Sequence, residues 1–136
     1  MTMTKTFDLS SSYAISRVIR GGWQLAGGHG AIDRAQAVDD LIAAFDAGIT
    51  TYDCADIYTG VEELIGAARV KLASERGLDV ATRMKVHTKL VPDLEVLPRI
   101  SRDYIRGIVE QSLRRLKIER LDLVQFHWWD LSLIHI

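Results

Sequence analysis

The order of strand-like and helix-like segments predicts an α/β protein with a parallel β-sheet. Four segments typical of strands alternate with three amphipathic segments, and crossover helices join parallel strands in this way. Gly22, Asp53, Lys89 and His127 are 31, 36 and 38 positions apart, so each interval holds one βα unit. Such units build either a doubly wound sheet or a (β/α)8 barrel, which needs about 250 residues. The 136 residues correspond to about half a barrel.

The composition is that of a soluble globular domain, with 48% hydrophobic residues, 26% charged residues and a net charge of −1. This charge gives no reason to expect nucleic acid or an acidic membrane surface as a partner. The N-terminus lacks an apolar signal segment, and no apolar run reaches the roughly 18 residues of a membrane span. Cys54 is the one cysteine and is expected to be a small buried residue, which favours a reducing compartment such as the cytoplasm.

Four segments are predicted to be strands because β-branched and aromatic residues are frequent in them. They are residues 16–25, which begin as a strand and end in glycines, and residues 49–53, 85–90 and 121–127. The stretch before the first of them, residues 7–15, is expected to form a small hairpin that plugs one end of the sheet.

Three helices are predicted between these strands. Asp33 stands at the N-cap of the first, which runs to residue 47 before Gly48 stops it. Thr59 and Glu62 have the spacing of a capping box and open the second helix, which ends near residue 77.

The third helix is predicted to begin at Ser101 as its N-cap. Basic residues near its C-terminus complement the helix dipole. Its apolar face is expected to consist of Ile105, Ile108, Val109, Ser112, Leu113 and Leu116.

Four polar residues stand where predicted strands end. Asp53 ends the second strand, Tyr58 follows in the next loop, Lys89 lies near the end of the third, and His127 ends the fourth. Because active groups of parallel α/β proteins gather at the carboxyl ends of the strands, we expect these side chains to reach one side of one sheet. Each residue alone is more often a cap, a packed ring or a surface charge, so the interpretation rests on the four together.

The four residue types suit proton donation to a carbonyl group. A free tyrosine has a pKa of about 10, too high for an efficient donor at neutral pH. A nearby lysine ammonium stabilises the phenolate and lowers that pKa, and an aspartate keeps the lysine charged and in place. A histidine beside the tyrosine can donate a hydrogen bond to the carbonyl. None of these groups supplies a hydride, so a reduction requires a nicotinamide cofactor.

The remaining tryptophan and histidine residues are given less specific roles. Trp23, Trp128 and Trp129 follow the first and fourth strands and are predicted to line an apolar substrate pocket. Strand alternation puts His87 on the face of Lys89, where a supporting or solvent-facing role is expected. No two histidines, cysteines or carboxylates have the spacing of a zinc site, so no metal is predicted.

At these residues the chain resembles the aldo-keto reductase family. The matching stretches are GGWQL, DRAQAVDDLIAAFDAGITTYDCADIYTGVEELIG, HTKL and QFHWWD, and the similarity covers residues 15–130. The resemblance implies a (β/α)8 TIM barrel truncated to about the first four βα units. It also implies reversible, NADPH-dependent reduction of an aldehyde or ketone. In that family Tyr58 would be the general acid, Lys89 and Asp53 its tuning pair, and His127 the group that orients the carbonyl.

The same resemblance puts Gly22, Trp23 and Asp53 beside the nicotinamide of NADPH and the substrate. The four further βα units of the family, which carry most of the cofactor site, do not follow the fourth strand. The tail LSLIHI, residues 131–136, instead looks like translated sequencing adapter. We therefore expect residues 1–130 to be the N-terminal half of a barrel, the tail to be non-native, and the chain alone to be inactive.

Two other interpretations stay open. Gly28-His29-Gly30 follows a strand, and Asp53 comes 23 residues later, as in part of the Rossmann dinucleotide-binding pattern. Asp33, however, stands where that pattern has its third glycine, and its carboxylate would face the pyrophosphate. The second interpretation is a non-catalytic barrel subunit that binds a partner protein, because the family includes channel-associated members. The sequence does not identify such a partner.

Overall fold

The computed structural model describes residues 5–128 and contains one four-stranded parallel sheet. Its strands are β3 (Ile19–Gly21), β4 (Thr51–Asp53), β5 (Lys85–Leu90) and β6 (Leu123–Phe126), which lie side by side in chain order. A doubly wound sheet reverses its strand order at a switch point, whereas a barrel adds strands in sequence. The sheet therefore has the topology of a barrel segment, and the Rossmann interpretation is wrong.

The first predicted strand is shorter than expected. Only Ile19–Gly21 pairs within the sheet, and Trp23–Ala26 forms the 3-10 helix η1. Ser16 belongs instead to the preceding hairpin, which consists of β1 (Thr6–Ser10) and β2 (Tyr13–Ser16). The predicted hairpin is thus confirmed.

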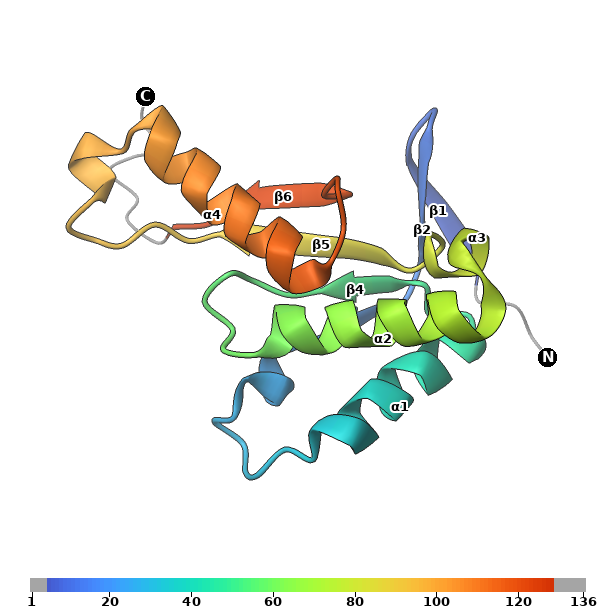
Figure 1. Ribbon diagram of the computed structural model, residues 1–136. Coiled ribbons are helices and arrows are strands. Elements are labelled where there is room, and N and C mark those ends of the chain that lie inside the picture. The colour runs from blue at the N-terminus through green and yellow to red at the C-terminus, as the bar shows by residue number, and fades with distance from the viewer. Residues whose placement is uncertain (1–4, 129–136) are drawn as a thin grey trace.

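The hairpin is fastened to the sheet at the amino-terminal ends of the strands (Figure 1). The Ser16 hydroxyl accepts hydrogen bonds from the backbone N–H groups of Thr50 and Thr51, at 3.2 and 3.1 Å. The backbone N–H of Ser16 donates in turn to the Thr51 hydroxyl at 3.1 Å. The hairpin therefore lies at the end of the sheet opposite to Asp53, the last residue of β4.

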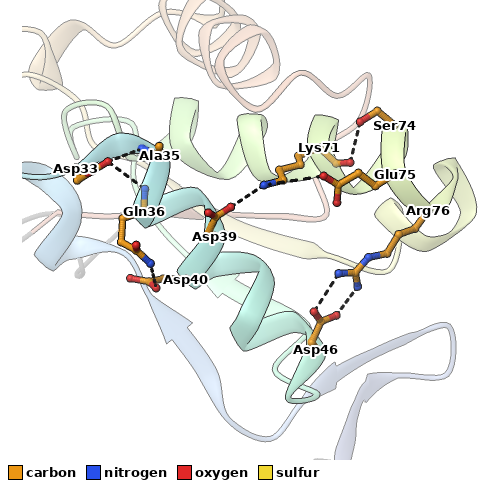
Figure 2. A network of polar contacts seen from close by, with 10 residues as sticks. All are labelled: Asp33, Ala35, Gln36, Asp39, Asp40, Asp46, Lys71, Ser74, Glu75 and Arg76. Carbon is orange, nitrogen blue, oxygen red and sulfur yellow. Dashed lines mark hydrogen bonds and ion pairs between the residues drawn. The ribbon is translucent and has the colours of Figure 1, made fainter.

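Three long helices lie on one side of the sheet (Figure 1). The first, α1 (Arg34–Asp46), begins as predicted, because the Asp33 carboxylate accepts from the N–H groups of Ala35 and Gln36 (Figure 2). Helix α2 (Val61–Arg76) packs beside it and ends at Gly77, also as predicted.

Charged side chains join the exposed surfaces of α1 and α2 (Figure 2). Lys71 pairs with Asp39 at 2.7 Å, and Arg76 contacts both carboxylate oxygens of Asp46. Exposed pairs of this kind contribute at most about 1 kcal/mol each, so the apolar faces beneath them hold the two helices together.

The start of α2 differs from the predicted capping box. Thr59 does not cap the helix; the N-cap is Gly60, whose positive φ of 76° suits glycine. Glu62 is fully buried rather than turned back to the helix start. A short helix that was not predicted, α3 (Leu78–Ala81), follows α2 before β5.

Helix α4 (Arg102–Leu116) follows the 3-10 turn η2 (Leu97–Arg99) and is capped by Ser101, as predicted. Its predicted apolar face is only partly buried. Ser112 and Leu116 are covered by α2, but Ile105 at the other end is 38% exposed. Gly66 of α2 permits the contact, because a Cβ there would lie 2.3 Å from the Arg115 carbonyl oxygen.

The core fills the space between α1, α2 and the strands β4 and β5. Tyr52 is its largest fully buried side chain, and its hydroxyl donates to the Leu41 carbonyl at 2.8 Å. That bond satisfies the one polar atom that the ring carries into the core. Among residues 5–128, no helix is long and apolar enough to cross a membrane.

Candidate active site

An ion pair lies at the carboxyl ends of β4 and β5. The Lys89 ammonium is 2.8 and 2.7 Å from the two carboxylate oxygens of Asp53 and 2.9 Å from the Cys54 carbonyl oxygen. The Lys89 and Asp53 side chains are 15% and 34% exposed, respectively, so solvent screens the pair only in part. Three oxygen acceptors hold the ammonium in one place, beside a neighbouring aromatic ring.

The neighbour is Tyr58. Its ring centre lies 5.3 Å from the Lys89 ammonium, and the ring packs half-buried against the core. The backbone N–H of Tyr58 donates to the Ala55 carbonyl at 3.1 Å, and its own carbonyl accepts from Val61 at 3.0 Å. These bonds fold residues 53–61 into a tight loop that returns Tyr58 to the strand end. The structure thus brings Asp53, Tyr58 and Lys89 together.

His127 follows the last residue of β6. Its backbone N–H donates to the Leu90 carbonyl at 3.0 Å, which extends the β5–β6 pairing by one residue. Lys89 pairs with Gln125 in that register, and strand alternation places residue 127 on the side of Gln125. His127 is half-buried and stands on the same edge of the sheet as Lys89.

Gly22 lies against the same edge. Its backbone N–H donates to the Asp53 carbonyl at 2.8 Å. A Cβ at this position would lie 2.7 Å from Val61 and 3.0 Å from the Asp53 carbonyl oxygen, so glycine is needed for the close approach. Trp23 beside it is 58% exposed and stands edge-on to His29, with 4.9 Å between ring centres.

The structure describes only one of the two other tryptophans that were predicted to line the pocket. Trp128 is half-buried, and its indole nitrogen has no hydrogen-bond partner among the described residues. Trp129 and the tail 131–136 lie outside the described residues. Cys54 is completely buried, as expected, and burial raises the pKa of its thiol to about 12. Within residues 5–128, no three metal-binding side chains gather.

Sequence reasoning missed a second carboxylate in the loop, Asp56. Its backbone N–H donates to the Lys89 carbonyl at 3.1 Å, and its side chain accepts from the N–H of Val91, also at 3.1 Å. Burial raises the pKa of the Asp56 carboxyl. Asp56 thereby continues the pairing of β4 with β5 beyond the end of β4.

A buried polar cluster anchors this loop to the helices. Glu62 accepts from the Thr88 hydroxyl at 2.7 Å and from Arg115 at 3.3 Å, and Arg115 also donates to the Asp56 carbonyl at 2.9 Å. Thr88 faces the helices because it alternates with Lys89. That alternation was the available signal, but the capping-box spacing of Glu62 led to the wrong interpretation.

Sequential parallel strands with polar groups at their carboxyl ends are the arrangement of (β/α)8-barrel enzymes. The model of the aldo/keto reductase family matches residues 17–133 of this chain. The chain therefore belongs to the aldo/keto reductase family.

Curated relatives support this membership. The chain is 38% identical over 128 residues to the 6-dehydroglucose reductase of Novosphingobium aromaticivorans, which covers 86% of the chain and 39% of the relative. It is 29% identical over 131 residues to the NADH-specific methylglyoxal reductase of Escherichia coli, which covers 88% of the chain and 40% of that relative.

Solved structures show the same fold. A crystal structure of a Pseudomonas aeruginosa protein ascribed to the aldo-keto reductases superposes with a TM-score of 0.71 at 27% identity. The match covers 95% of this chain and 50% of that one. The chain thus spans half or less of the length of these relatives. The predicted fold, a TIM barrel truncated to about its first four βα units, is confirmed.

Proposed function

We propose that the protein carrying this chain reduces an aldehyde or ketone to an alcohol, with a reduced nicotinamide dinucleotide as the hydride donor. The observation that carries the proposal is the Lys89 ammonium, held by Asp53 and placed beside the Tyr58 ring. Family membership supplies the class of reaction, an oxidation–reduction of a carbonyl compound.

Tyr58 is the general acid in this proposal. Its hydroxyl gives a proton to the carbonyl oxygen as the hydride reaches the carbonyl carbon. The Lys89 ammonium, 5.3 Å from the ring centre, stabilises the phenolate that is left behind. Asp53 keeps that ammonium charged and oriented. His127, on the same edge, donates a hydrogen bond that orients the carbonyl.

The cofactor is proposed to approach over Gly22, Trp23 and Asp53. Gly22 lets this segment of backbone lie close against Asp53 and Val61, and the exposed Trp23 ring offers an apolar surface beside it. We propose NADPH as the dinucleotide, and because one relative is named as NADH-specific, the assay must compare both. Trp23, Trp128 and Trp129 are proposed to line the pocket of a small carbonyl substrate.

The proposal is tested in the polypeptide that includes the remaining βα units, because this chain covers half or less of its relatives. Residues 1–130 are proposed to be the first half of that barrel. Oxidation of NADPH and NADH is followed with a panel of simple aldehydes and ketones. Tyr58→Phe is expected to lower kcat by roughly 100- to 10,000-fold, since it removes the general acid.

Tyr104→Phe is the matched control. The Tyr104 hydroxyl bonds to Asp93, outside the proposed site, so this variant is expected to keep wild-type kcat. A Tyr58→Phe enzyme with full reductase activity would refute the role of the acid. A folded wild-type protein that oxidises neither dinucleotide with any carbonyl compound would favour the non-catalytic subunit instead.

A further inference from the structure

His87 lies directly beneath the proposed catalytic pair. It is paired in register with Asp53 across the β4–β5 ladder, and its carbonyl accepts the N–H of Cys54 at 2.8 Å. Alternation along β5 puts its side chain on the same face as Lys85 and Lys89. The residue is only 6% exposed, so it does not face solvent.

Tyr13 holds the imidazole from below. The Tyr13 hydroxyl, carried by the hairpin, lies 3.0 Å from Nε2 of His87, and the ring centres are 5.9 Å apart. Burial raises the pKa of Tyr13 to about 12, so the hydroxyl keeps its proton and can donate it. Donation to Nε2 requires a neutral imidazole with its proton on Nδ1. Burial lowers the pKa of the His87 imidazole, because it disfavours the charged form, so the imidazole stays neutral more readily.

Charged groups surround this imidazole from every packed element. Besides Tyr13 on β2, they are Asp53 on β4, Lys85 and Lys89 on β5, and Asp122 just before β6. Lys85 donates to the Ala14 carbonyl of the hairpin and lies 4.6 Å from the Tyr13 ring centre. A protonated His87 would be a third cation on this face, after Lys85 and Lys89. It would compete with Lys89 for the Asp53 carboxylate.

We propose that His87 is a positioning residue for the pair of Lys89 and Asp53. When the imidazole is neutral and accepts from Tyr13, the Asp53 carboxylate stays paired with Lys89. When the imidazole is protonated, the imidazolium attracts that carboxylate away from Lys89. The Lys89 ammonium then loses its fixed place beside Tyr58, and the proton transfer slows. The inference rests on the proposed function only for its effect on turnover; the coupling between His87 and Asp53 is independent of it.

The first test is the pH dependence of kcat in the full-length enzyme. Wild type is expected to lose activity several-fold as the pH falls below 6.5, the ordinary pKa of histidine, because burial lowers the pKa of His87 and the imidazole gains its proton only there. His87→Gln keeps an acceptor for the Tyr13 hydroxyl but cannot become charged, so this loss should disappear. Tyr13→Phe releases the imidazole, and its loss of kcat should begin at higher pH. Tyr104→Phe should reproduce the wild-type profile.

The outcome that overturns the inference is a His87→Gln enzyme that is active at pH 7.5 and shows the wild-type acid profile. A purely structural role would lower kcat at every pH without changing the shape of the profile.

The second test needs no turnover. The His87 imidazole is titrated by NMR in wild type, Tyr13→Phe and Asp53→Asn. Asp53→Asn should lower the titration midpoint, since the carboxylate favours the imidazolium, and Tyr13→Phe should raise it. An unchanged midpoint in Asp53→Asn refutes the coupling. Absence of reductase activity with the predicted NMR shifts would refute the proposed function and leave the coupling intact.

Discussion

Across the strand order the sheet and its helices have two halves, here called the closed side and the open side, which differ sharply in how much of their apolar surface is covered. On the closed side, formed by α1, α2, β4 and β5, Tyr52 and Leu64 are at most 1% exposed. On the open side, formed by α4 and β6, Val124 and Phe126 are 40% and 56% exposed. Asp53 and Lys89 belong to the closed side, whereas His127 follows the strand of the open side. The proposed proton-tuning pair is therefore held beside a complete core, and the proposed carbonyl-orienting residue is not.

The register of the strands explains the exposure on the open side. Val124 and Phe126 pair with Thr88 and Leu90, which are buried beneath the helices. The β6 residues therefore point to the same face of the sheet, but α4 packs against β5 and leaves these two side chains exposed. The chain covers only 50% of the similar Pseudomonas aeruginosa structure, so it spans part of a barrel. The difference between the sides thus reflects how much of the barrel the chain spans.

Removing side-chain volume should destabilise the closed side most. Leu64→Ala creates a cavity in the core and is expected to lower the free energy of unfolding by about 2–5 kcal/mol. Leu94→Ala is the matched control, because Leu94 is 67% exposed and its truncation should change stability by less than about 0.5 kcal/mol. Urea unfolding followed by circular dichroism measures both. Equal losses would show that the closed side is not the stabilising core.

The sequence predicted the elements of both sides well, because each depends on local signals. Asp33 and Ser101 cap their helices as expected, since a cap acts within three residues. The partners of Glu62 were not predicted, because Thr88 and Arg115 are distant in the chain. Local spacing alone favoured a cap, and tertiary burial overrode it.

The candidate site was predicted in the same uneven way. The grouping of Asp53, Tyr58 and Lys89 followed from strand ends, which parallel topology brings to one edge. The support beneath it was not predictable, because Tyr13 reaches His87 only when the hairpin folds over the amino-terminal end of the sheet. A contact of that kind depends on the path of the chain in space rather than on the periodicity of either segment.

Alkaline pH should weaken the closed side through Cys54. Burial raises the pKa of this thiol from 9.0 to about 12. The folded state then binds the proton more tightly than the unfolded state, so the contribution is complete below about pH 9 and is lost as the pH rises toward 12. The loss is expected to approach about 1.4 kcal/mol per pH unit. Chemical denaturation of wild type and Cys54→Ala between pH 8 and about 10.5 measures the difference in slope.

Two buried tyrosines, Tyr13 and Tyr52, titrate in the same direction and remain in both proteins. Their contribution therefore cancels in the comparison, and only the difference between the slopes belongs to Cys54. Parallel stability curves for wild type and Cys54→Ala would show that the thiol titrates alike in the folded and unfolded states, contrary to its burial.

Adding charge to the open side should change stability least and association most. Among residues 5–128 no strand pairs with the outer edge of β6, which lies beside an apolar surface, and such an edge favours pairing between copies. We expect the 136-residue chain to form aggregates or loose oligomers in light scattering, and Phe126→Lys to reduce them with a change in stability of about 0.5 kcal/mol or less. Phe7→Lys on the hairpin, where Phe7 is 53% exposed, is the matched control and should leave association unchanged.

If both variants reduce association equally, exposed apolar area in general is responsible. If the wild-type chain is a monodisperse monomer with a sharp thermal transition, the open side is stable without further βα units and the contrast between the two sides is wrong.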